Sequence, residues 1–311
     1  MRILVLGATG YLGAHVARRL RALADVRVLH GGRSPGAEYG IDLAADRTGR
    51  LAETLAAAAP DAVVNCAGAT AGDPVALAEA NARGPAVLCA ALGEAAPAAR
   101  LVHLGSAAEY GPGAFGVRVG ESAPASPVTP YGVTKLAGTV AVAASGLDAV
   151  VLRVGNPVGP GAPATGLPGR ITALLGAAGQ DPRAVLRLGD LSAYRDFVDV
   201  RDVARAAALA ATVPGPLPPV LNIGAGEAVP VRELVHGLAH RAGFRGRIEE
   251  DPGGTAGSAR SAEVSWQCSD ITAAARALGW RPQRRLDEML ASLWDAGRGG
   301  RAAARDGSRV P

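Results

Sequence analysis

The chain repeats a short apolar run followed by a segment of helical periodicity, and this repetition predicts its fold. The runs at residues 2–6 and 62–68 are apolar on both faces, as in a parallel sheet that helices cover on both sides. The expected strands are 2–6, 25–30, 62–68, 100–106 and 148–154, and the expected helices between them are 14–20, 73–95 and 131–145. Asp202 is expected to cap a further helix at 203–211. The sequence therefore predicts an α/β fold with a doubly wound parallel sheet of the Rossmann type.

The regular alternation loosens after the fifth strand, and this change indicates a second region. Pro and Gly are dense up to about residue 190, and a further apolar run follows near residue 220. We predict a dinucleotide-binding Rossmann domain at 1–155, to which residues 191–223 return. A smaller, interleaved C-terminal substrate-binding region is expected from 156–190 and 224–296. The Gly-, Arg- and Ala-rich residues 297–311 are expected to form a disordered tail.

Three glycines lie between the first strand and the first helix, at the spacing of a dinucleotide-binding turn. Gly7 permits the tight turn, Gly10 lets a phosphate approach the backbone, and Gly13 lets the helix pack closely on the strand. The helix N-terminus that follows attracts a pyrophosphate. The pattern carries weight because it follows a strand and opens a helix. The residues expected to contact the cofactor here are Gly7, Thr9, Gly10, Tyr11, Leu12 and Gly13.

The end of the second strand indicates which dinucleotide the chain binds. Chains that bind NAD usually place an acidic residue there, which accepts from the ribose hydroxyls. Here His30 and two glycines are followed by Arg33 and Ser34, which can donate to a 2′-phosphate. NADP(H) is therefore favoured, with NAD(H) as the alternative. Further expected cofactor contacts are Asp42, whose carboxylate can accept from the adenine amine, Leu43, the small residues Ala67 and Gly68, and Asn81.

A tyrosine and a lysine four residues apart form the candidate proton-transfer pair. Tyr131 and Lys135 share one face of the expected helix, because positions i and i+4 are neighbours. Lowering a phenol pKa from about 10 toward 7 requires about 4 kcal/mol. A cation about 4 Å away supplies roughly that amount at an effective dielectric constant of about 20. Of the 32 Lys and Arg residues, Lys135 is the one lysine, so a compact ammonium replaces the usual planar guanidinium here.

Ser106 completes the candidate catalytic set. It stands at the carboxyl end of the fourth expected strand, which is where open α/β sheets bind their ligands. We expect Ser106 to orient a carbonyl and Tyr131 to pass a proton. Lys135 is expected to tune the tyrosine and to hold the nicotinamide ribose, so Tyr131 and Lys135 are expected cofactor contacts as well.

Composition and charge exclude several other classes of protein. The chain has 311 residues, of which 49% are hydrophobic, and this is ample for a core. A net charge of +4 with scattered arginines gives no nucleic-acid footprint. No apolar run approaches the ~20 residues of a membrane span, and the immediate first strand argues against a signal peptide. The three cysteines are widely spaced with no metal-binding pattern, so we expect no metal and a reducing, cytoplasmic location.

Several motifs follow one another in the order of a known family. Besides Gly7–Gly13 and Tyr131–Lys135, they are Ser106–Gly111, Arg153–Gly161, Arg195–Ala204, Asn222–Glu227 and Leu278–Pro282. Over nearly its whole length the chain resembles the extended short-chain dehydrogenase/reductases, specifically the nucleotide-sugar epimerases, dehydratases and reductases. The resemblance implies an NAD(P) cofactor and a C-terminal region that holds a nucleoside-diphosphate sugar. It also implies a homodimer joined by a four-helix bundle that uses the helix of Tyr131.

The resemblance further implies a set of substrate contacts. Arg195 matches one arginine of the family's diphosphate clamp, and Arg260 resembles the second; guanidinium forks suit a diphosphate. Asn156 resembles a position that contacts the substrate. Ser106 and Ala107 complete the expected substrate contacts.

The residues after Ser106 narrow the choice of reaction. Dehydratases of this family need an acid there, and the methyl groups of Ala107 and Ala108 cannot shuttle protons. Glu109 resembles the acid that 4-keto-6-deoxysugar reductases carry before Tyr-Gly. We therefore expect NADPH-dependent reduction of the C4 ketone of an NDP-4-keto-6-deoxyhexose, in deoxysugar biosynthesis. The alternatives are an NAD-dependent NDP-sugar 4-epimerase, a ketoreductase of a non-sugar natural-product ketone, and a non-catalytic NAD(P)-binding module.

Overall fold

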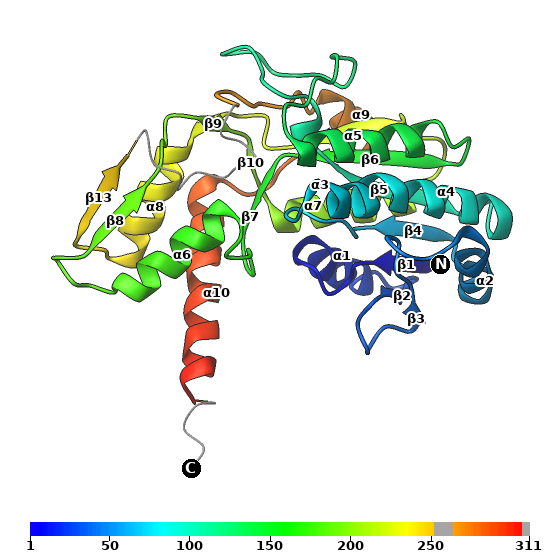
Figure 1. Cartoon of the computed structure of the whole chain (residues 1–311), viewed down its shortest axis with the longest axis horizontal. Helices are drawn as coiled ribbons and strands as arrows, with labels where there is room; N and C mark the ends of the chain where they lie inside the picture. Colours follow the sequence, from blue (N-terminus) through cyan, green and yellow to red (C-terminus); the bar gives the residue numbers. More distant parts are fainter. Residues whose placement is uncertain (252–263, 307–311) are drawn as a thin grey trace.

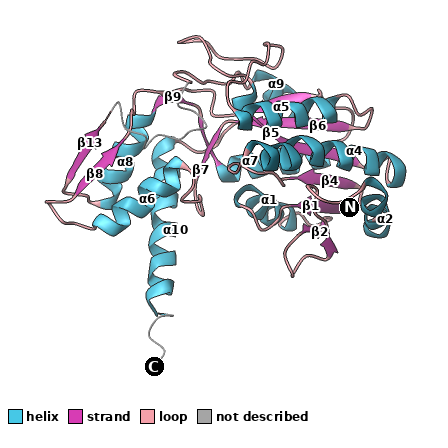
Figure 2. Cartoon of the chain, in the orientation of Figure 1, coloured by secondary structure: helices cyan, strands magenta, loops and turns pink. Residues whose placement is uncertain are grey.

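A seven-stranded, all-parallel sheet forms the centre of the larger region in the computed structural model, which describes residues 1–251 and 264–306 (Figures 1 and 2). The strand order is β11-β6-β5-β4-β1-β2-β3. The strands are β1 (Arg2–Leu6), β2 (Arg27–Gly32), β3 (Tyr39–Gly40), β4 (Ala62–Asn65), β5 (Arg100–Ser106), β6 (Ala149–Val154) and β11 (Val220–Ile223). This order reverses direction at β1, so the predicted doubly wound Rossmann fold is confirmed.

Helices cover both faces of this sheet, which explains why its strands are apolar on both sides. On one face α2 (Thr48–Ala58), α4 (Gly84–Ala95) and α5 (Pro130–Ala143) bury leucines such as Leu55 and Leu88 against Leu101 of β5. On the other face α1 (Tyr11–Arg21) and α7 (Val200–Thr212) pack side by side.

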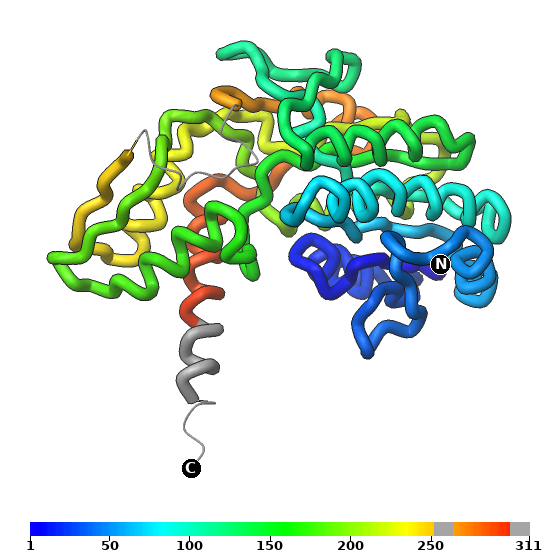
Figure 3. Tube along the Cα trace, in the orientation of Figure 1, coloured from blue at the N-terminus to red at the C-terminus, as the bar shows by residue number. Residues whose placement is uncertain are grey.

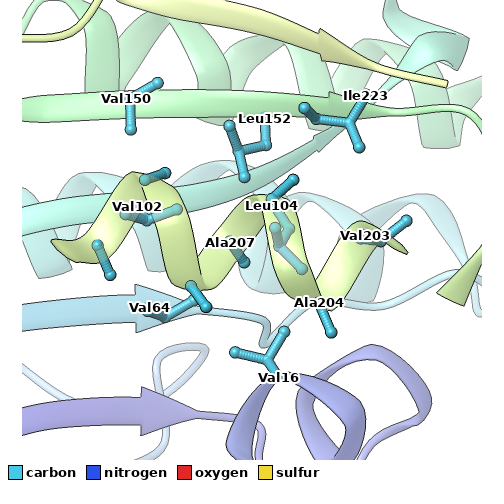
Figure 4. Close-up of a cluster of buried hydrophobic side chains, with 14 of the residues drawn as sticks. Val16, Val64, Val102, Leu104, Val150, Leu152, Val203, Ala204, Ala207 and Ile223 are labelled. Carbon is cyan, nitrogen blue, oxygen red and sulfur yellow. The ribbon is translucent and has the colours of Figure 1, made fainter. Parts of the chain in front are cut away.

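The strand register builds the core beneath α1 and α7 as continuous rows of branched side chains. Val64, Val102 and Val150 are partners across β4, β5 and β6, and all three are fully buried. Figure 4 shows this row facing Ala207 of α7, while Val16 of α1 closes the cluster. The small side chains of α7 let that helix lie close to the sheet.

The cap of α7 differs from the prediction. Asp199 is the N-cap residue, and its carboxylate accepts from the backbone N–H of Arg201 at 2.7 Å. Asp202 lies in the first turn instead, where it is fully buried and accepts from the backbone N–H groups of Gln283 and Arg284. The helix therefore starts three residues before the expected position.

The expected helix at 73–95 is interrupted. It consists of α3 (Pro74–Ala78), a π-helical turn at Glu79–Arg83, and α4. Asp73 caps α3, as the sequence suggests, by accepting from the backbone N–H groups of Val75 and Ala76. The π-helical turn carries Asn81, and such turns frequently occur at functional sites.

The smaller region has its own core and lies beside the sheet (Figure 1). It contains α6 (Leu167–Ala178), α8 (Val231–Ala242), α10 (Leu286–Asp306) and a two-stranded parallel sheet of β8 (Val185–Leu188) and β13 (Arg247–Glu250). Two short pairs connect the regions, β7 (Asn156–Val158) with β10 (Phe197–Asp199) and β9 (Tyr194–Arg195) with β12 (Val229–Pro230).

Two predicted boundaries require correction. Helix α9 (Thr272–Leu278) and Trp280 pack into the core of the large sheet rather than into the smaller region, because Ala274, Leu278 and Trp280 bury one apolar face there. The tail expected to be disordered at 297–311 is helical up to Asp306, since α10 continues past Gly297, and residues 307–311 lie outside the described part of the chain. Figure 3 shows the first part of α10 beside α6 and α8. Among the described residues, no helix is long and apolar enough to span a bilayer.

Candidate active site

The glycine turn after β1 has the shape that a dinucleotide requires. Gly7 has φ +73°, and a Cβ there would lie 2.9 Å from the backbone nitrogen of Ala67. A Cβ on Gly13 would collide with the carbonyl oxygen of Gly7, so only glycine lets α1 approach this closely. Gly10 is the N-cap of α1, with no side-chain cap and no acidic residue in the first turn. The N–H groups at the start of α1 thus suit an anionic pyrophosphate.

The predicted adenosine contacts lie at the ends of β2, β3 and β4. Arg33 is exposed and precedes a turn in which the backbone N–H of Ala37 donates to the carbonyl of Ser34 at 3.0 Å. Asp42 accepts from the backbone N–H of Ala44, and Leu43 is buried in the core. Sequence reasoning missed Glu38, whose carboxylate accepts from the backbone N–H of His30 in β2 at 3.3 Å.

Asn81, a predicted cofactor contact, also holds the neighbouring loop in place. Only 1% of it is exposed, and its amide both accepts from the backbone N–H of Ala69 at 2.9 Å and donates to the carbonyl of Ala69 at 2.8 Å. It also donates to Thr134 Oγ1 at 3.3 Å. Asn81 therefore fixes the loop that carries Ala67 and Gly68 against α5, and we assign it a positioning role.

Ser106 ends β5 and is held by the short 3₁₀ turn Ala107–Glu109. Its Oγ accepts from the backbone N–H of Ala108 at 3.2 Å, and Glu109 Oε1 accepts from the Ser106 N–H at 2.7 Å. This reciprocal capping box fixes both the serine backbone and its side chain. A hydroxyl that accepts one hydrogen bond still has its own proton to donate to a carbonyl.

A buried ion pair, which sequence reasoning missed, lies behind Ser106. Arg153 Nε donates to Glu109 Oε2 at 2.7 Å, with 6% and 0% of the two side chains exposed. Burial disfavours the charge on Arg153, but the Glu109 carboxylate and the Tyr110 hydroxyl together outweigh this effect and raise the pKa of Arg153. The guanidinium also lies 4.5 Å above the ring of Tyr110, whose hydroxyl donates to Asn222 at 2.8 Å. Glu109 is therefore turned away from the edge of the sheet and supports Ser106.

Helix α5 brings Tyr131 and Lys135 to the same edge as Ser106. Thr129 caps the helix by accepting from the backbone N–H of Gly132 at 3.2 Å. A Cβ on Gly132 would lie 2.6 Å from the carbonyl oxygen of Ala108, so the first turn of α5 rests directly on the turn after Ser106. This close contact places the tyrosine and the serine on adjoining segments.

Lys135 is almost fully buried beneath this edge. It is 5% exposed, and its Nζ donates to the carbonyl of Leu104 at 2.5 Å. Burial lowers its pKa to about 8, against the opposing effects of Glu109 and Cys66. The ammonium therefore still carries its charge at neutral pH, one helical turn after Tyr131.

The predicted substrate contacts lie where the two regions meet, except for Arg260, which is outside the described residues. Arg195 is 6% exposed, and burial lowers its pKa to about 10, so it stays charged at neutral pH. Asn156 donates to Gln267 Oε1 at 2.9 Å. Ala107 is buried in the turn after Ser106. Among the described residues, no cluster of His, Cys, Asp or Glu could hold a metal ion.

Two further features of this region escaped sequence reasoning. Asp196 is fully buried and accepts from the backbone N–H groups of Ala225 and Ser269, which ties the segment of Arg195 to the far end of the chain. Asp196 lies between β9 and β10, beside the apolar Phe197 and Val198, and this neighbourhood could have indicated a buried acid. Phe115, Tyr194 and Trp266 form an aromatic cluster with ring centroids 4.6–5.5 Å apart. These rings come from three segments that are far apart in the sequence, so no local sequence pattern predicts the cluster.

Comparison with known proteins is consistent with this geometry. The family description "NAD dependent epimerase/dehydratase family" matches residues 3–224. The dTDP-6-deoxy-L-talose 4-dehydrogenase (NAD(P)(+)) of Kitasatospora kifunensis is 39% identical over 306 residues, which are 95% of either protein. The GDP-6-deoxy-D-mannose reductase of Pseudomonas aeruginosa is 27% identical and covers 94% of this chain and 95% of its own.

The fold also matches a solved structure. RMD from Pseudomonas aeruginosa, complexed with NADPH, aligns with a TM-score of 0.81 over 96% of this chain and 99% of its own, at 24% identity. The resemblance identified from the sequence motifs is confirmed. The chain belongs to the NAD-dependent epimerase/dehydratase family of extended short-chain dehydrogenase/reductases, and it is an NAD(P)-dependent oxidoreductase.

Proposed function

We propose that the protein reduces the C4 ketone of an NDP-4-keto-6-deoxyhexose with NADPH. The turn after Ser106 is the observation that carries this proposal. Ala107 and Ala108 have no titratable group, and the one acid of the turn, Glu109, is committed to Arg153. Elimination of water needs an acid at this place, whereas exchange between a ketone and an alcohol needs only one proton donor. Two relatives, named as a 6-deoxy-talose 4-dehydrogenase and a 6-deoxy-mannose reductase, support a 6-deoxysugar as substrate.

The residues at this edge can perform the proton-transfer part of that reaction. Ser106 donates to the ketone oxygen and steadies the charge that develops on it. Tyr131 gives its proton to this oxygen, and the Lys135 ammonium favours the phenolate that remains. When bound, NADPH supplies hydride to the carbonyl carbon. In this proposal Arg195 and Arg260 hold the diphosphate and Asn156 contacts the sugar.

A single-turnover assay tests the proposed reaction. A dTDP-4-keto-6-deoxyhexose mixed with excess enzyme and NADPH should consume one NADPH per ketone, as followed by absorbance, and yield a C4 alcohol. The alternative of an NAD-dependent 4-epimerase is favoured by Glu38, since a carboxylate beside β2 can accept from ribose hydroxyls. Inversion at C4 of a dTDP-sugar without added cofactor would support the epimerase and contradict the reductase.

Arg33 should determine the preference for NADPH over NADH. We expect Arg33→Ala to lower kcat/KM for NADPH about 10- to 100-fold, because a charge-assisted hydrogen bond contributes about 1.5–3 kcal/mol. The value for NADH should change less than threefold. Arg27→Ala, at the exposed start of β2, removes the same charge as a control. Steady-state kinetics with both cofactors measures the effect, and an equal loss for NADH would contradict the assignment.

We also propose that the chain forms a homodimer through α4 and α5. Val133 and Val140 project from α5 with 50% and 56% exposure, and Ala86 and Ala90 of α4 are exposed. Apolar surface on two adjacent helices suits a four-helix bundle between two copies. Val140→Glu should shift the protein from dimer to monomer in light scattering after size exclusion, because it would bury a charge. Leu174→Glu, on exposed α6, should leave the dimer intact; a monomeric parent protein would overturn the proposal.

A further inference from the structure

A basic cavity lies away from the edge of the sheet where Ser106 and Tyr131 meet. It is a space of about 480 Å³ between α1, α7 and the segment before α10. Its described lining contains Arg18, Arg19, Arg201, Arg205 and Arg284, and no acidic side chain. This volume lies within the range of small-molecule sites. Figure 1 shows α1 and α7 on the same face of the sheet.

The positive charge of this cavity is only partly neutralised. Arg201 binds buried Asp199 through two hydrogen bonds of 2.8 and 2.6 Å. Arg205 and Arg284 approach one oxygen of buried Asp202 at 3.4 and 3.3 Å. Glu288 contributes a further negative charge from α10, acting on Arg201. Five guanidinium groups against three carboxylates leave an excess of two positive charges around the cavity.

His15 borders the cavity as a neutral ring and orients Arg18. The Arg18 guanidinium donates to His15 Nδ1, so Nε2 carries the ring proton and donates to the carbonyl of Pro160 at 2.9 Å. Burial lowers the pKa of His15, which keeps the ring neutral at pH 7. Arg18 is thereby held at the cavity with its remaining N–H groups available.

Arg205 carries the clearest sign of a ligand. Its Nε is buried and has no hydrogen-bond partner among the described residues, although one terminal nitrogen, Nη2, donates to both Asp202 and the carbonyl of Arg281. The guanidinium lies 5.7 Å from the centre of the Trp280 ring, which limits its freedom to turn toward water. A buried donor without a partner is unfavourable, and an anionic oxygen in the cavity would satisfy it.

We propose that this cavity binds the phosphate chain of a small molecule, of the kind carried by pyrophosphate and nucleoside triphosphates. Several arginine forks converging on one space match phosphate oxygens in charge and geometry. The site is separate from the dinucleotide turn, because that turn uses residues 7–13, whereas Arg18 and Arg19 lie in the second half of α1. It therefore adds a ligand to the proposed function and does not depend on it.

Calorimetric titration of the NADPH-saturated protein with pyrophosphate and, separately, with ATP tests the proposal. NADPH occupies the dinucleotide turn, and saturating dTDP added with it occupies the proposed diphosphate site of Arg195, so neither of these sites can account for the binding. We expect both ligands to bind at one further site per chain. Arg18→Gln/Arg19→Gln, which changes two exposed residues of α1, should weaken binding at least tenfold. Arg241→Gln/Arg245→Gln removes two exposed arginines elsewhere and should leave it unchanged.

Two further variants distinguish this cavity from the proposed sugar-nucleotide site. Arg205→Lys keeps the charge but removes Nε, and should weaken pyrophosphate binding at least threefold. Arg195→Gln should leave it unchanged, because Arg195 belongs to the proposed sugar-nucleotide site. Absence of saturable binding would overturn the proposal. So would equal weakening by the two double variants, loss of binding in Arg195→Gln, or binding of ATP without pyrophosphate. None of these measurements depends on turnover of a sugar.

Discussion

Replacing Tyr131 by Phe should lower kcat for ketone reduction by about 10²- to 10⁴-fold, the usual contribution of a positioned general acid. The substitution removes one oxygen atom at the start of α5 and leaves the ring. The cap at Thr129, the contact of Gly132 with Ala108 and the buried Lys135 all remain, so the helix should keep its place. Single-turnover oxidation of NADPH with saturating sugar nucleotide measures the loss.

The control for this prediction is another tyrosine at the cofactor side of the sheet. Tyr39→Phe in β3 makes the same chemical change away from Ser106 and should retain at least half of kcat. NADPH binding, followed by nicotinamide fluorescence, should change less than threefold in both variants. If Tyr131→Phe kept more than a tenth of the parent rate, the proton would come from another group. Because Lys135 has a pKa of about 8, the parent rate should be compared at pH 7, where the ammonium persists.

Local chemistry explains which parts of this molecule were predictable from sequence. A parallel strand between two helical layers must be apolar on both faces, and β1 and β4 show that pattern without reference to anything else. The turn of Gly7, Gly10 and Gly13 and the pair of Tyr131 and Lys135 are also short-range patterns. In each case the residues that interact lie within a few positions of one another.

Long-range partners account for the features that the sequence does not reveal. Glu109 is recognisable in the sequence from the Tyr-Gly that follows it. Its fully buried position depends on Arg153, which is 44 residues away. The sequence predicts Asp202 as the cap of α7, whereas Asp199 is the N-cap residue of that helix. Only the packing of residues 280–284 against α7 shows that Asp202 is needed to accept their backbone N–H groups. The roles of such acids are decided by which distant segment folds over them.

Among the polar contacts of the site, the ion pair of Glu109 and Arg153 should be the one whose loss destabilises the fold most. We expect Glu109→Ala to lower the free energy of unfolding by about 3–5 kcal/mol, because it leaves the Arg153 guanidinium buried without its counter-charge. The Ser106 N–H would lose its acceptor as well. Urea unfolding at pH 7, followed by circular dichroism and extrapolated linearly to water, measures the change.

Two comparisons show whether burial and pairing, rather than loss of a carboxylate as such, cause this effect. Glu249→Ala breaks the exposed pair with Arg187 at 3.3 Å and should cost no more than about 1 kcal/mol. The double variant Glu109→Leu/Arg153→Met removes both charges and should recover part of the stability lost in Glu109→Ala, since no uncompensated charge stays buried. It should not recover kcat, because the capping box that orients Ser106 is absent. If Glu109→Ala were no more destabilising than Glu249→Ala, the pair would not support the serine, and Ser106 would have to be positioned by the contact of α5 with Ala108 alone.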